Sequence, residues 1–355
     1  MKVALLGDTH FGARNDNSAF HDYFEKFYEQ IFIPYLVENK IDTVVQFGDL
    51  FDRRKYINFS TLAKSRRYFF DPLKELDIKM HVFVGNHDTF YKNTNEVNSP
   101  ELLLNDYTNV QVYSDPCDIT LDGTKITLLP WVCSGNYETC MSHIQETDAQ
   151  ILFGHLELAG FEMHRGAVND HGQFDNDVLS KFDVVCSGHF HHKSSRGNIH
   201  YLGTPYEMSW SDYNDPRGFH IFDTETRELT FIRNPFTMFQ KWFYDDTEWS
   251  GFDALNNFPF ADAKGCIVKV VVKNKTNPYW FDMYIDKLEK AGTIDIQVVE
   301  DHLNLNLEDD DDIVDEAEDT LTILRKVVDG IDTNVPKKDL DSFLTTLYSE
   351  ALHQE

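Results

Sequence analysis

Short apolar runs alternate with longer amphipathic stretches over the first 235 residues of the chain, a pattern typical of α/β proteins. The stretch after Ser18 places its aromatic residues on one helical face, and Pro34 is expected to kink or crowd the far end of this helix. Ser60 is expected to cap a second helix, and Ser99-Pro100 has the order that begins a third. The predicted strands cover residues 3–6, 43–47, 80–84, 126–129, 151–153 and 184–186.

The pattern changes at about residue 236, and this change divides the chain. Residues 266–272 and 294–299 are predicted strands on either side of a predicted helix over 279–290. Residues 301–320 hold ten acidic side chains and no Lys or Arg, and repulsion between like charges predicts a solvated linker there. We therefore expect a main domain over 1–235, a small α/β capping domain over 236–305 and an acidic linker over 306–316.

Helical periodicity returns after the linker. Apolar side chains recur at helical spacing from Ala317 to Ile331, and a second stripe follows Pro336. Two helices of this length are too small to bury both stripes in a core of their own. Residues 317–355 are therefore expected to pack on the main body or on another protein, and the acidic linker favours the other protein.

The overall charge excludes some classes of protein. The chain has 355 residues, with 32 Lys and Arg against 60 Asp and Glu, which gives a formal net charge of −28. A protein that binds nucleic acid or an anionic membrane with its whole surface is not expected at this charge. Contact with DNA would instead require a local site, a metal or a partner protein.

The cysteines and the apolar runs indicate the compartment. Five cysteines, an odd number without zinc-finger spacing, are typical of a reduced chain. No apolar run reaches the roughly 18 residues of a membrane span. Asp8 and His10 lie where the apolar region of a signal peptide would continue. A cytoplasmic location is therefore expected.

Five strands end in a glycine that is followed at once by a residue able to bind a metal. Because ligands bind beyond the carboxyl ends of strands in open α/β sheets, these loops are expected to converge. Imidazole, carboxylate and amide groups suit Mn²⁺, Fe²⁺ or Zn²⁺, and two ions about 3.5–4 Å apart catalyse phosphoryl transfer. A single histidine at a strand end is more often structural, but five segments in order favour a metal centre. The segments are Gly7-Asp8-Thr9-His10, Gly48-Asp49-Leu50-Phe51-Asp52, Gly85-Asn86-His87-Asp88, Gly154-His155 and Gly188-His189-Phe190-His191.

The order of these segments resembles that of the calcineurin-type metallophosphoesterase superfamily, whose fold is a two-sheet α/β/β/α sandwich. Within it, the chain is similar to the SbcD/Mre-type recombination nucleases, and most similar to the nuclease subunits of T-even-like phages. The resemblance extends over nearly the whole chain and includes the acidic linker and the two tail helices. Further matching segments are Leu128-Leu129-Pro130-Trp131, Gly154-His155-Leu156-Glu157-Leu158, Tyr201-Leu202-Gly203-Thr204-Pro205 and Asn214-Asp215-Pro216-Arg217-Gly218-Phe219.

The resemblance implies a role for each residue of the five segments. The cofactor would be a pair of Mn²⁺ ions, with Mg²⁺ as the alternative, and the nucleophile would be a metal-activated water. His87 would contact the scissile phosphate and stabilise or protonate the leaving oxygen, and Asp88 would orient and charge His87. The implied ligands are Asp8, His10 and His191 for the first ion, Asn86, His155 and His189 for the second, and Asp49 between the two.

Two residues near these segments keep alternative interpretations. Asp52 stands where some relatives carry a second catalytic histidine, and it would either accept a hydrogen bond behind the metal ligands or cap a turn. His171 lies in a polar loop, where a surface position is the default and a role at the substrate is the alternative.

Several basic residues lie beside the motif loops in an otherwise acidic chain. They are either ordinary solvated charges or contacts to the DNA backbone, and such contacts would position a DNA end without reading its sequence. DNA affinity of this chain alone is then expected to be weak and strongly salt-dependent. The candidate DNA-binding residues are Arg14, Arg53, Arg54, Lys55, Lys92 and Lys193.

The resemblance also implies partners. An SbcC-type coiled-coil ABC ATPase would bind residues 317–355, and ATP binding would come from that protein because this sequence has no Walker A segment. A homodimer is also implied, formed by the helix near residues 60–77 or by the early Phe-rich helix.

The function expected from the resemblance is a Mn²⁺-dependent DNA nuclease subunit. It would act as a 3′-to-5′ double-strand exonuclease and a single-strand endonuclease in DNA end processing, recombination, repair and replication, in a phage or a bacterial setting. The alternative is a phosphatase or small-molecule phosphodiesterase with the same two-metal site. A third interpretation, a non-catalytic subunit that tethers DNA ends, would be marked by loss of a metal ligand, and every expected ligand is present.

Overall fold

The computed structural model of the chain describes residues 1–249 and 252–300. In this part of the chain, two six-stranded sheets carry the metal-ligand motifs. The first sheet has the order β14-β13-β1-β2-β3-β4, and β1 to β4 run parallel. Its strands are β1 (Lys2–Leu6), β2 (Thr43–Gln46), β3 (Lys79–Phe83), β4 (Val110–Tyr113), β13 (Gly218–Asp223) and β14 (Leu229–Arg233).

The second sheet has the order β11-β12-β10-β7-β6-β5. Its four central strands are parallel, and the strand at each edge is antiparallel to its neighbour. Its strands are β5 (Cys117–Leu121), β6 (Thr124–Leu129), β7 (Ile151–His155), β10 (Val184–Gly188), β11 (Ser194–Arg196) and β12 (Ile199–Tyr201), and a separate hairpin pairs β8 (Glu162–His164) with β9 (Ala167–Val168).

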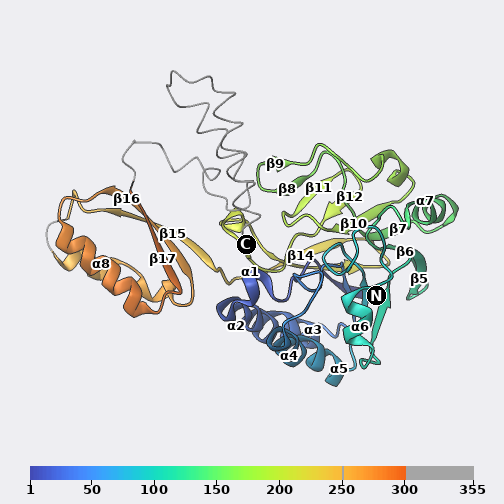
Figure 1. Ribbon diagram of the computed structural model, residues 1–355, viewed down its shortest axis with the longest axis horizontal. Helices are drawn as coiled ribbons and strands as arrows, with labels where there is room; N and C mark the ends of the chain where they lie inside the picture. The colour runs from blue at the N-terminus through green and yellow to red at the C-terminus, as the bar shows by residue number, and fades with distance from the viewer. Residues whose placement is uncertain (250–251, 301–355) are drawn as a thin grey trace, which may run out of the picture. The chain divides into compact units, whose positions relative to one another are not determined.

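The two sheets pack face to face around a shared apolar core. Val45 and Phe83 of the first sheet lie in one buried cluster with Ile126 and Phe153 of the second. The rings of Phe47 and Phe153 meet across this interface, with centroids 5.3 Å apart. Helices cover the outer faces, so the predicted α/β/β/α sandwich is confirmed (Figure 1).

The outer face of the first sheet is covered by two long helical segments, whose apolar stripe was predicted from the sequence. The first consists of α2 (Ser18–Phe27), a π-helical turn at Tyr28–Phe32 and α3 (Ile33–Glu38). The second consists of α4 (Phe59–Ser65), a π-helical turn at Arg66–Phe70 and α5 (Asp71–Glu75). These four α-helices lie together on one side of the sheets in Figure 1.

Each π-helical turn ends shortly before a proline. The N–H of Ile33 donates to the carbonyl of Tyr28 just before Pro34, and the N–H of Asp71 donates to Arg66 just before Pro72. A proline has no N–H and its ring crowds the carbonyl four residues earlier, so a wider turn accommodates it without ending the helix. The predicted disturbance at Pro34 therefore takes the form of a π-helical turn.

Two predicted helix starts are shifted by one or two residues. Asn58, not Ser60, caps α4, because the Asn58 side chain accepts the N–H of Ser60. Asn98 caps α6 (Ser99–Leu104) by accepting the N–H of Glu101. Asparagine is as good a cap as serine, and the sequence places both types side by side at these starts.

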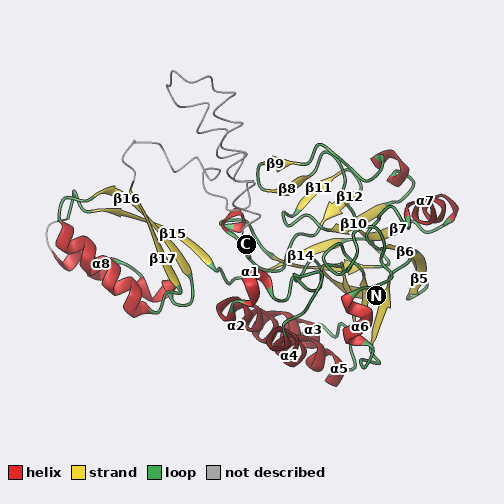
Figure 2. Ribbon diagram, in the orientation of Figure 1, coloured by secondary structure: helices red, strands yellow, loops and turns green. Residues whose placement is uncertain are grey.

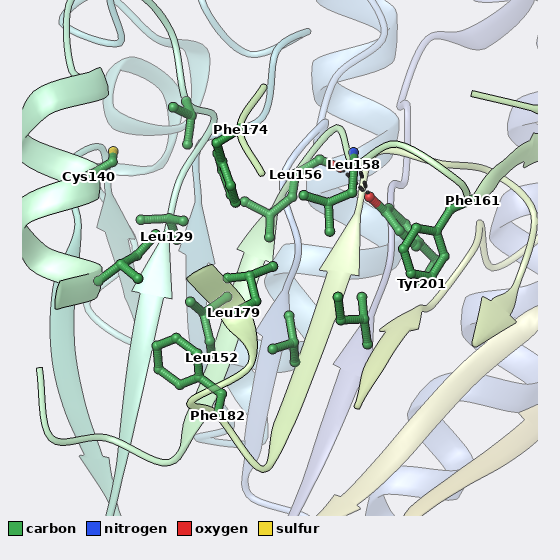
Figure 3. Close-up of a cluster of buried hydrophobic side chains, with 14 of the residues drawn as sticks. Leu129, Cys140, Leu152, Leu156, Leu158, Phe161, Phe174, Leu179, Phe182 and Tyr201 are labelled. Carbon is green, nitrogen blue, oxygen red and sulfur yellow. Dashed lines mark hydrogen bonds between the residues drawn. The ribbon is translucent and has the colours of Figure 1, made fainter. Parts of the chain in front are cut away.

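The outer face of the second sheet is covered by α7 (Tyr137–Glu146) and by the loops around it. Cys140 and Ile144 of α7 pack with Leu152 and Leu179 in a second buried cluster (Figure 3). The remaining short elements are α1 (Ala13–Asp16) and the 3₁₀ turns η3 (Asn176–Leu179), η4 (Trp210–Asp212), η5 (Phe252–Asn257) and η6 (Phe260–Ala263).

A three-stranded sheet follows, coloured by secondary structure in Figure 2. Its strands β15 (Phe239–Asp245), β16 (Ile267–Asn274) and β17 (Asp295–Glu300) are parallel, and α8 (Pro278–Ala291) connects the last two. This unit has its own buried cluster, which includes Val270 and Tyr284. The two predicted strands and the helix are confirmed, and β15 is an additional strand. The domain boundaries stay a prediction, and the linker over 306–316 and the tail over 317–355 lie outside the described residues.

None of the helices in residues 1–249 and 252–300 is both long enough and apolar enough to span a membrane.

Candidate metal centre

The five glycine-containing segments meet at the carboxyl ends of their strands. They follow β1, β2 and β3 in the first sheet and end β7 and β10 in the second. Neighbouring parallel strands place their carboxyl ends at one edge, and the face-to-face packing brings the two edges together. The predicted convergence is observed as three groups of acidic and imidazole side chains, each with ligand atoms within 4.8 Å of one another.

The first group consists of Asp8, His10 and His191. The Nε2 atoms of His10 and His191 are 3.1 Å apart and face each other. Asp8 is fully buried and accepts the backbone N–H of His189 with both carboxylate oxygens, at 3.1 and 2.9 Å. This hydrogen bonding fixes the carboxylate of the first loop against the fifth.

The second group consists of Asp49, His155 and His189, and Asn86 completes it. The Nε2 atom of His155 lies 3.4 Å from Asp49 Oδ2. Asn86 Oδ1 lies 2.9 Å from His155 Nε2 and 2.9 Å from His189 Nδ1. Two imidazole nitrogens and two side-chain oxygens therefore point at one small volume.

Asp49 lies between the two groups. Its Oδ2 atom is 3.4 Å from His155 Nε2 and 3.8 Å from His10 Nε2. Its Oδ1 atom accepts the backbone N–H of His87 at 2.6 Å. One carboxylate oxygen thus faces ligand atoms of both groups, the position expected for a bridging ligand.

The outward nitrogens of the imidazoles determine which nitrogen faces the centre. His155 Nδ1 donates to the carbonyl of Phe47 at 2.7 Å, which leaves the Nε2 lone pair directed inward. His10 Nδ1 lies 3.4 Å from Asp52 Oδ1, so its Nε2 is also the inward atom. Asp52 therefore lies behind a ligand, which supports the hydrogen-bonding interpretation of this residue over the turn cap.

The donor atoms fit a cation. Asn86 Oδ1 faces His155 Nε2, His189 Nδ1 and Asp49 Oδ2 at 2.9, 2.9 and 3.3 Å, and a carboxylate, an amide oxygen and two imidazole lone pairs supply no proton to bind one another. Oxygen and nitrogen donors directed at one point are the ligand set of a divalent transition-metal ion. The residues present therefore fit the pair of metal ions that the sequence predicts.

The backbone at the centre is strained at three ligand positions. His10, Asp49 and His189 have φ values of 41°, 49° and 85°, in the left-handed region that side chains other than glycine avoid. Such a conformation costs about 1–3 kcal/mol per residue and is concentrated at functional sites. Gly85 allows the close approach, because a Cβ there would lie 2.3 Å from Asp49 N and Oδ1.

The buried charges shift one another's pKa values. Burial opposes a charge on His155, but the Asp49 carboxylate outweighs it and raises the pKa of His155 to about 9. The pKa of His10 is likewise raised to about 9 by Asp52 and Asp49 against burial. His155 in turn holds the pKa of Asp49 well below its ordinary value, although burial opposes this. His10 and His155 therefore carry protons that a divalent cation would replace.

His87 lies beside these ligands with one nitrogen already fixed. Its Nδ1 donates to the backbone carbonyl of Asp52 at 2.6 Å, and its ring meets the ring of His10 edge to face, with centroids 4.8 Å apart. Burial lowers the pKa of His87. The ring is thus oriented by the second loop, with Nε2 left for another partner.

The expected partnership of Asp88 with His87 is wrong in its geometry. Asp88 is fully buried, and its carboxylate accepts the backbone N–H groups of Leu50 and Gly85, both at 2.9 Å, and of Phe51 at 3.4 Å. These bonds tie the second loop to the third. The group that orients His87 is the carbonyl of Asp52, because the turn of the third loop directs Asp88 inward.

The candidate DNA-binding residues differ in their surroundings. Arg53 is paired with Asp16 at 3.4 Å, whereas Arg54 Nη2 lies 3.2 Å from the side-chain nitrogen of Asn86. Arg14, Lys55 and Lys92 are exposed, and Lys193 Nζ lies 4.8 Å from the ring centroid of Phe231. Of the six, Arg54 is the one placed beside a metal-ligand side chain. His171 is exposed.

The sequence analysis missed the residues that hold the fifth loop. Arg217 is 3% exposed and donates to the carbonyl of His191, to Thr204 Oγ1 and to Asp215 Oδ2. Asp215 also lies 2.8 Å from Nδ1 of His192. The segment around Asp215 and Arg217 was noted only as a resemblance, and its signal was a buried charge pair that sequence alone does not reveal.

Comparisons with known proteins agree with this geometry. The family described as calcineurin-like phosphoesterase matches residues 1–193. Exonuclease subunit 1 of Enterobacteria phage T4 is 34% identical over 353 residues, which cover 99% of each chain. The SbcD chain of the nuclease SbcCD from Staphylococcus epidermidis is 24% identical over 65% of this chain and 69% of its own. The DNA double-strand break repair protein Mre11 of Sulfurisphaera tokodaii is 29% identical over 54% of this chain and 49% of its own.

Proposed function

The chain belongs to the calcineurin-like phosphoesterase family as a metal-dependent phosphodiester hydrolase of the nuclease branch, and we propose that it is a two-metal DNA nuclease subunit. Its substrates would be double-stranded DNA, degraded from 3′ to 5′, and single-stranded DNA, cleaved internally. The observation that carries the proposal is the convergence of carboxylate, amide and imidazole groups around Asp49 in a chain whose relatives are named as nucleases.

The proposed ligands are those expected from the sequence. Two divalent cations, Mn²⁺ in preference to Mg²⁺, would supply positive charge to the phosphate oxygens and lower the pKa of a water nucleophile. The geometry that supports this assignment is the inward direction of one nitrogen on each imidazole. The ligands are Asp8, His10 and His191 at one position, Asn86, His155 and His189 at the other, and Asp49 between them.

The chain's own residues would orient the substrate and move a proton. His87 Nδ1 stays hydrogen-bonded to the Asp52 carbonyl, so His87 Nε2 is free to face the scissile phosphate. A phosphate anion beside the ring raises the pKa of His87, which allows Nε2 to donate a proton to the leaving oxygen. Asp88 acts through the backbone, because it keeps the second and third loops in register and thereby keeps His87 beside Asp49.

The test is digestion of a 3′-end-labelled duplex in Mn²⁺, Mg²⁺ or EDTA by the wild type, Asp49→Ala and His87→Ala. Release of label that depends on Mn²⁺ and is lost in both variants supports the proposal. His171→Ala is the matched control, because this exposed histidine lies outside the groups of ligands and should retain activity. Turnover of a generic phosphomonoester without cleavage of any DNA would favour the alternative phosphatase function.

An ATPase partner is part of the proposal. The relatives named as subunits of a nuclease suggest a larger assembly, and an SbcC-type ABC ATPase would bind residues 317–355 through their two apolar stripes. Leu344→Asp places a charge in the second stripe and should abolish co-purification with the matching ATPase. Lys337→Asp changes charge outside the stripe and should leave it unchanged. Loss in both variants would contradict binding through the stripe.

A homodimer is also proposed, and the described residues favour one of the two helical regions considered. The early Phe-rich helix uses its aromatic face for the sheet, since Phe24 and Phe27 are fully buried. The region around α4 and α6 instead exposes large apolar side chains, with Phe59 88% and Leu102 65% exposed. These side chains line a cavity of about 230 Å³ together with Tyr56, Leu62, Phe90 and Val97, and we name these six residues the apolar patch.

A further inference from the structure

Two adjacent arginines after β2 have opposite surroundings. Arg53 lies 3.4 Å from Asp16 Oδ2 and donates to Asn15 Oδ1 at 2.8 Å and to the Tyr56 hydroxyl at 2.5 Å. Within residues 1–249 and 252–300, no carboxylate lies within ion-pair distance of Arg54. Arg54 is partly buried, and its Nη2 atom lies 3.2 Å from the side-chain nitrogen of Asn86. Arg54 is therefore a cation at the metal centre whose charge no acidic side chain balances.

The contact between Arg54 and Asn86 depends on how the Asn86 amide is turned. With Oδ1 directed at the ligand cluster, the amide NH₂ group faces Arg54, and these two donors are unable to bond to each other. If the amide is turned over, Asn86 accepts from Arg54 and donates to His155, His189 and Asp49. The first orientation suits a bound cation, because the oxygen is then a ligand, and the second suits a centre without one.

Metal binding and the surroundings of Arg54 are therefore linked. When Asn86 Oδ1 binds a cation, Arg54 loses the acceptor that the turned amide would provide. Two N–H donors then lie side by side, next to the second ligand group, and an anionic oxygen between them would accept from both. Such charge-assisted hydrogen bonds are the strong ones in proteins, and arginine is well suited to a phosphate.

We propose that Arg54 and the side-chain NH₂ group of Asn86 together bind a non-bridging oxygen of the scissile phosphate, and that cation binding makes them available. This inference rests on the proposed nuclease function and adds a substrate contact to it. It assigns Arg54 to the reacting phosphate, whereas Arg53 stays in an ion pair with Asp16. Phosphate and metal then bind cooperatively, in part through Arg54.

The test is a calorimetric titration of Mn²⁺ into the full-length protein, with and without submillimolar inorganic phosphate. Wild type, Arg54→Gln and the matched control Arg53→Gln are compared, and circular dichroism verifies their folding. For Arg54→Gln we expect unchanged or tighter Mn²⁺ binding without phosphate, because no Arg54–Asn86 bond has to break. Phosphate affinity of the Mn²⁺-loaded variant should fall about tenfold or more, the range for hydrogen bonds to charged groups.

Arg54→Lys keeps the charge but loses the planar donor group, and it should recover only part of the phosphate affinity. Equal phosphate affinity in Arg54→Gln and the wild type would overturn the assignment, as would equal losses in Arg54→Gln and Arg53→Gln. These outcomes leave the proposed nuclease intact if the wild type binds Mn²⁺ and cleaves DNA. A wild type that binds no Mn²⁺ would instead overturn the proposed function and this inference together.

Discussion

At the scale of single residues, the centre depends on which nitrogen of each imidazole faces inward. His155 is held by the Phe47 carbonyl and His10 by the Asp52 carboxylate, so the inward nitrogen of each is Nε2. The pKa of both imidazoles is raised to about 9. At neutral pH these nitrogens are protonated, and a metal ion has to displace the protons before it binds.

Metal affinity should therefore increase with pH. Each raised pKa means that the proton is bound below about pH 9, so binding at pH 7 releases a proton from His10 and one from His155. Two released protons correspond to roughly a hundredfold gain in affinity per pH unit below that pKa. The measurement is calorimetry of Mn²⁺ binding at pH 6.5 and 7.5 in buffers of different ionisation enthalpy. Affinity that is equal at the two pH values would contradict this account.

The close approach at Gly85 gives a second prediction at this scale. A Cβ there would lie 2.3 Å from Asp49 N and Oδ1, so Gly85→Ala should displace the bridging carboxylate and abolish metal-dependent cleavage. Gly123→Ala is the control, because a Cβ at that loop position meets no atom within 4 Å. Its positive φ should still cost about 1 kcal/mol of stability. Wild-type Mn²⁺ affinity in Gly85→Ala would refute the argument.

The ligand residues of the centre could be proposed from the sequence because each follows a glycine at a strand end. The arrangement behind the ligands could not. Asp88 was expected at His87, but three backbone N–H groups attract its carboxylate, and the Asp52 carbonyl takes that place. Which hydrogen bonds form depends on how two loops far apart in sequence pack together, and spacing along one loop does not encode that.

At the scale of elements, apolar periodicity predicted the strands that are buried on both faces. It missed strands such as β4 and β15, where apolar and polar side chains alternate less clearly or belong to another sheet. It also placed one helical cap on Ser60, whereas Asn58 competes for the same role two residues earlier. The π-helical turns before Pro34 and Pro72 are a local response to proline, which the sequence indicated only as a disturbance.

The start of β15 gives a prediction about stability. Glu207 is 3% exposed, and its carboxylate accepts the N–H groups of Met238 and Phe239 at 2.6 and 2.9 Å. Burial raises the pKa of Glu207 from 4.5 to about 7, so its stabilising contribution is present below pH 4.5 and is lost as the pH rises through 7. Glu207→Gln mimics the neutral form, and its advantage over the wild type should grow to about 3 kcal/mol above pH 8.

The measurement is urea unfolding of the metal-free wild type and Glu207→Gln at pH 5 and pH 8.5. Glu38→Gln, at an exposed position of α3, removes the same charge without burial and should show no such difference. A Glu207→Gln variant that is less stable than the wild type at pH 8.5 would mean that the charged form is favoured by its two N–H donors.

At the scale of the whole molecule, the charge and the surface constrain how the chain acts. A net charge of −28 repels DNA, so binding has to come from the metal centre, from local cations such as Arg54 and from partner proteins. A large apolar surface exposed on such an acidic chain has a cost that contact with another protein removes. The apolar patch is that surface among the described residues, and it adjoins the loop that carries Asp88.

The apolar patch should mediate self-association of the full-length chain. Phe59→Asp and Leu102→Asp each place a charge in a contact centre that has to be dry, so each should weaken dimerisation at least about tenfold. Light scattering after size exclusion should give twice the chain mass for the wild type and the mass of one chain for both variants. Val37→Asp is the matched control, because Val37 is 52% exposed on α3 and lies outside the apolar patch. A monomeric wild type, or dissociation in Val37→Asp as well, would argue that the apolar patch serves a different partner, and retention of Mn²⁺ binding in both variants would show that the metal centre forms within one chain.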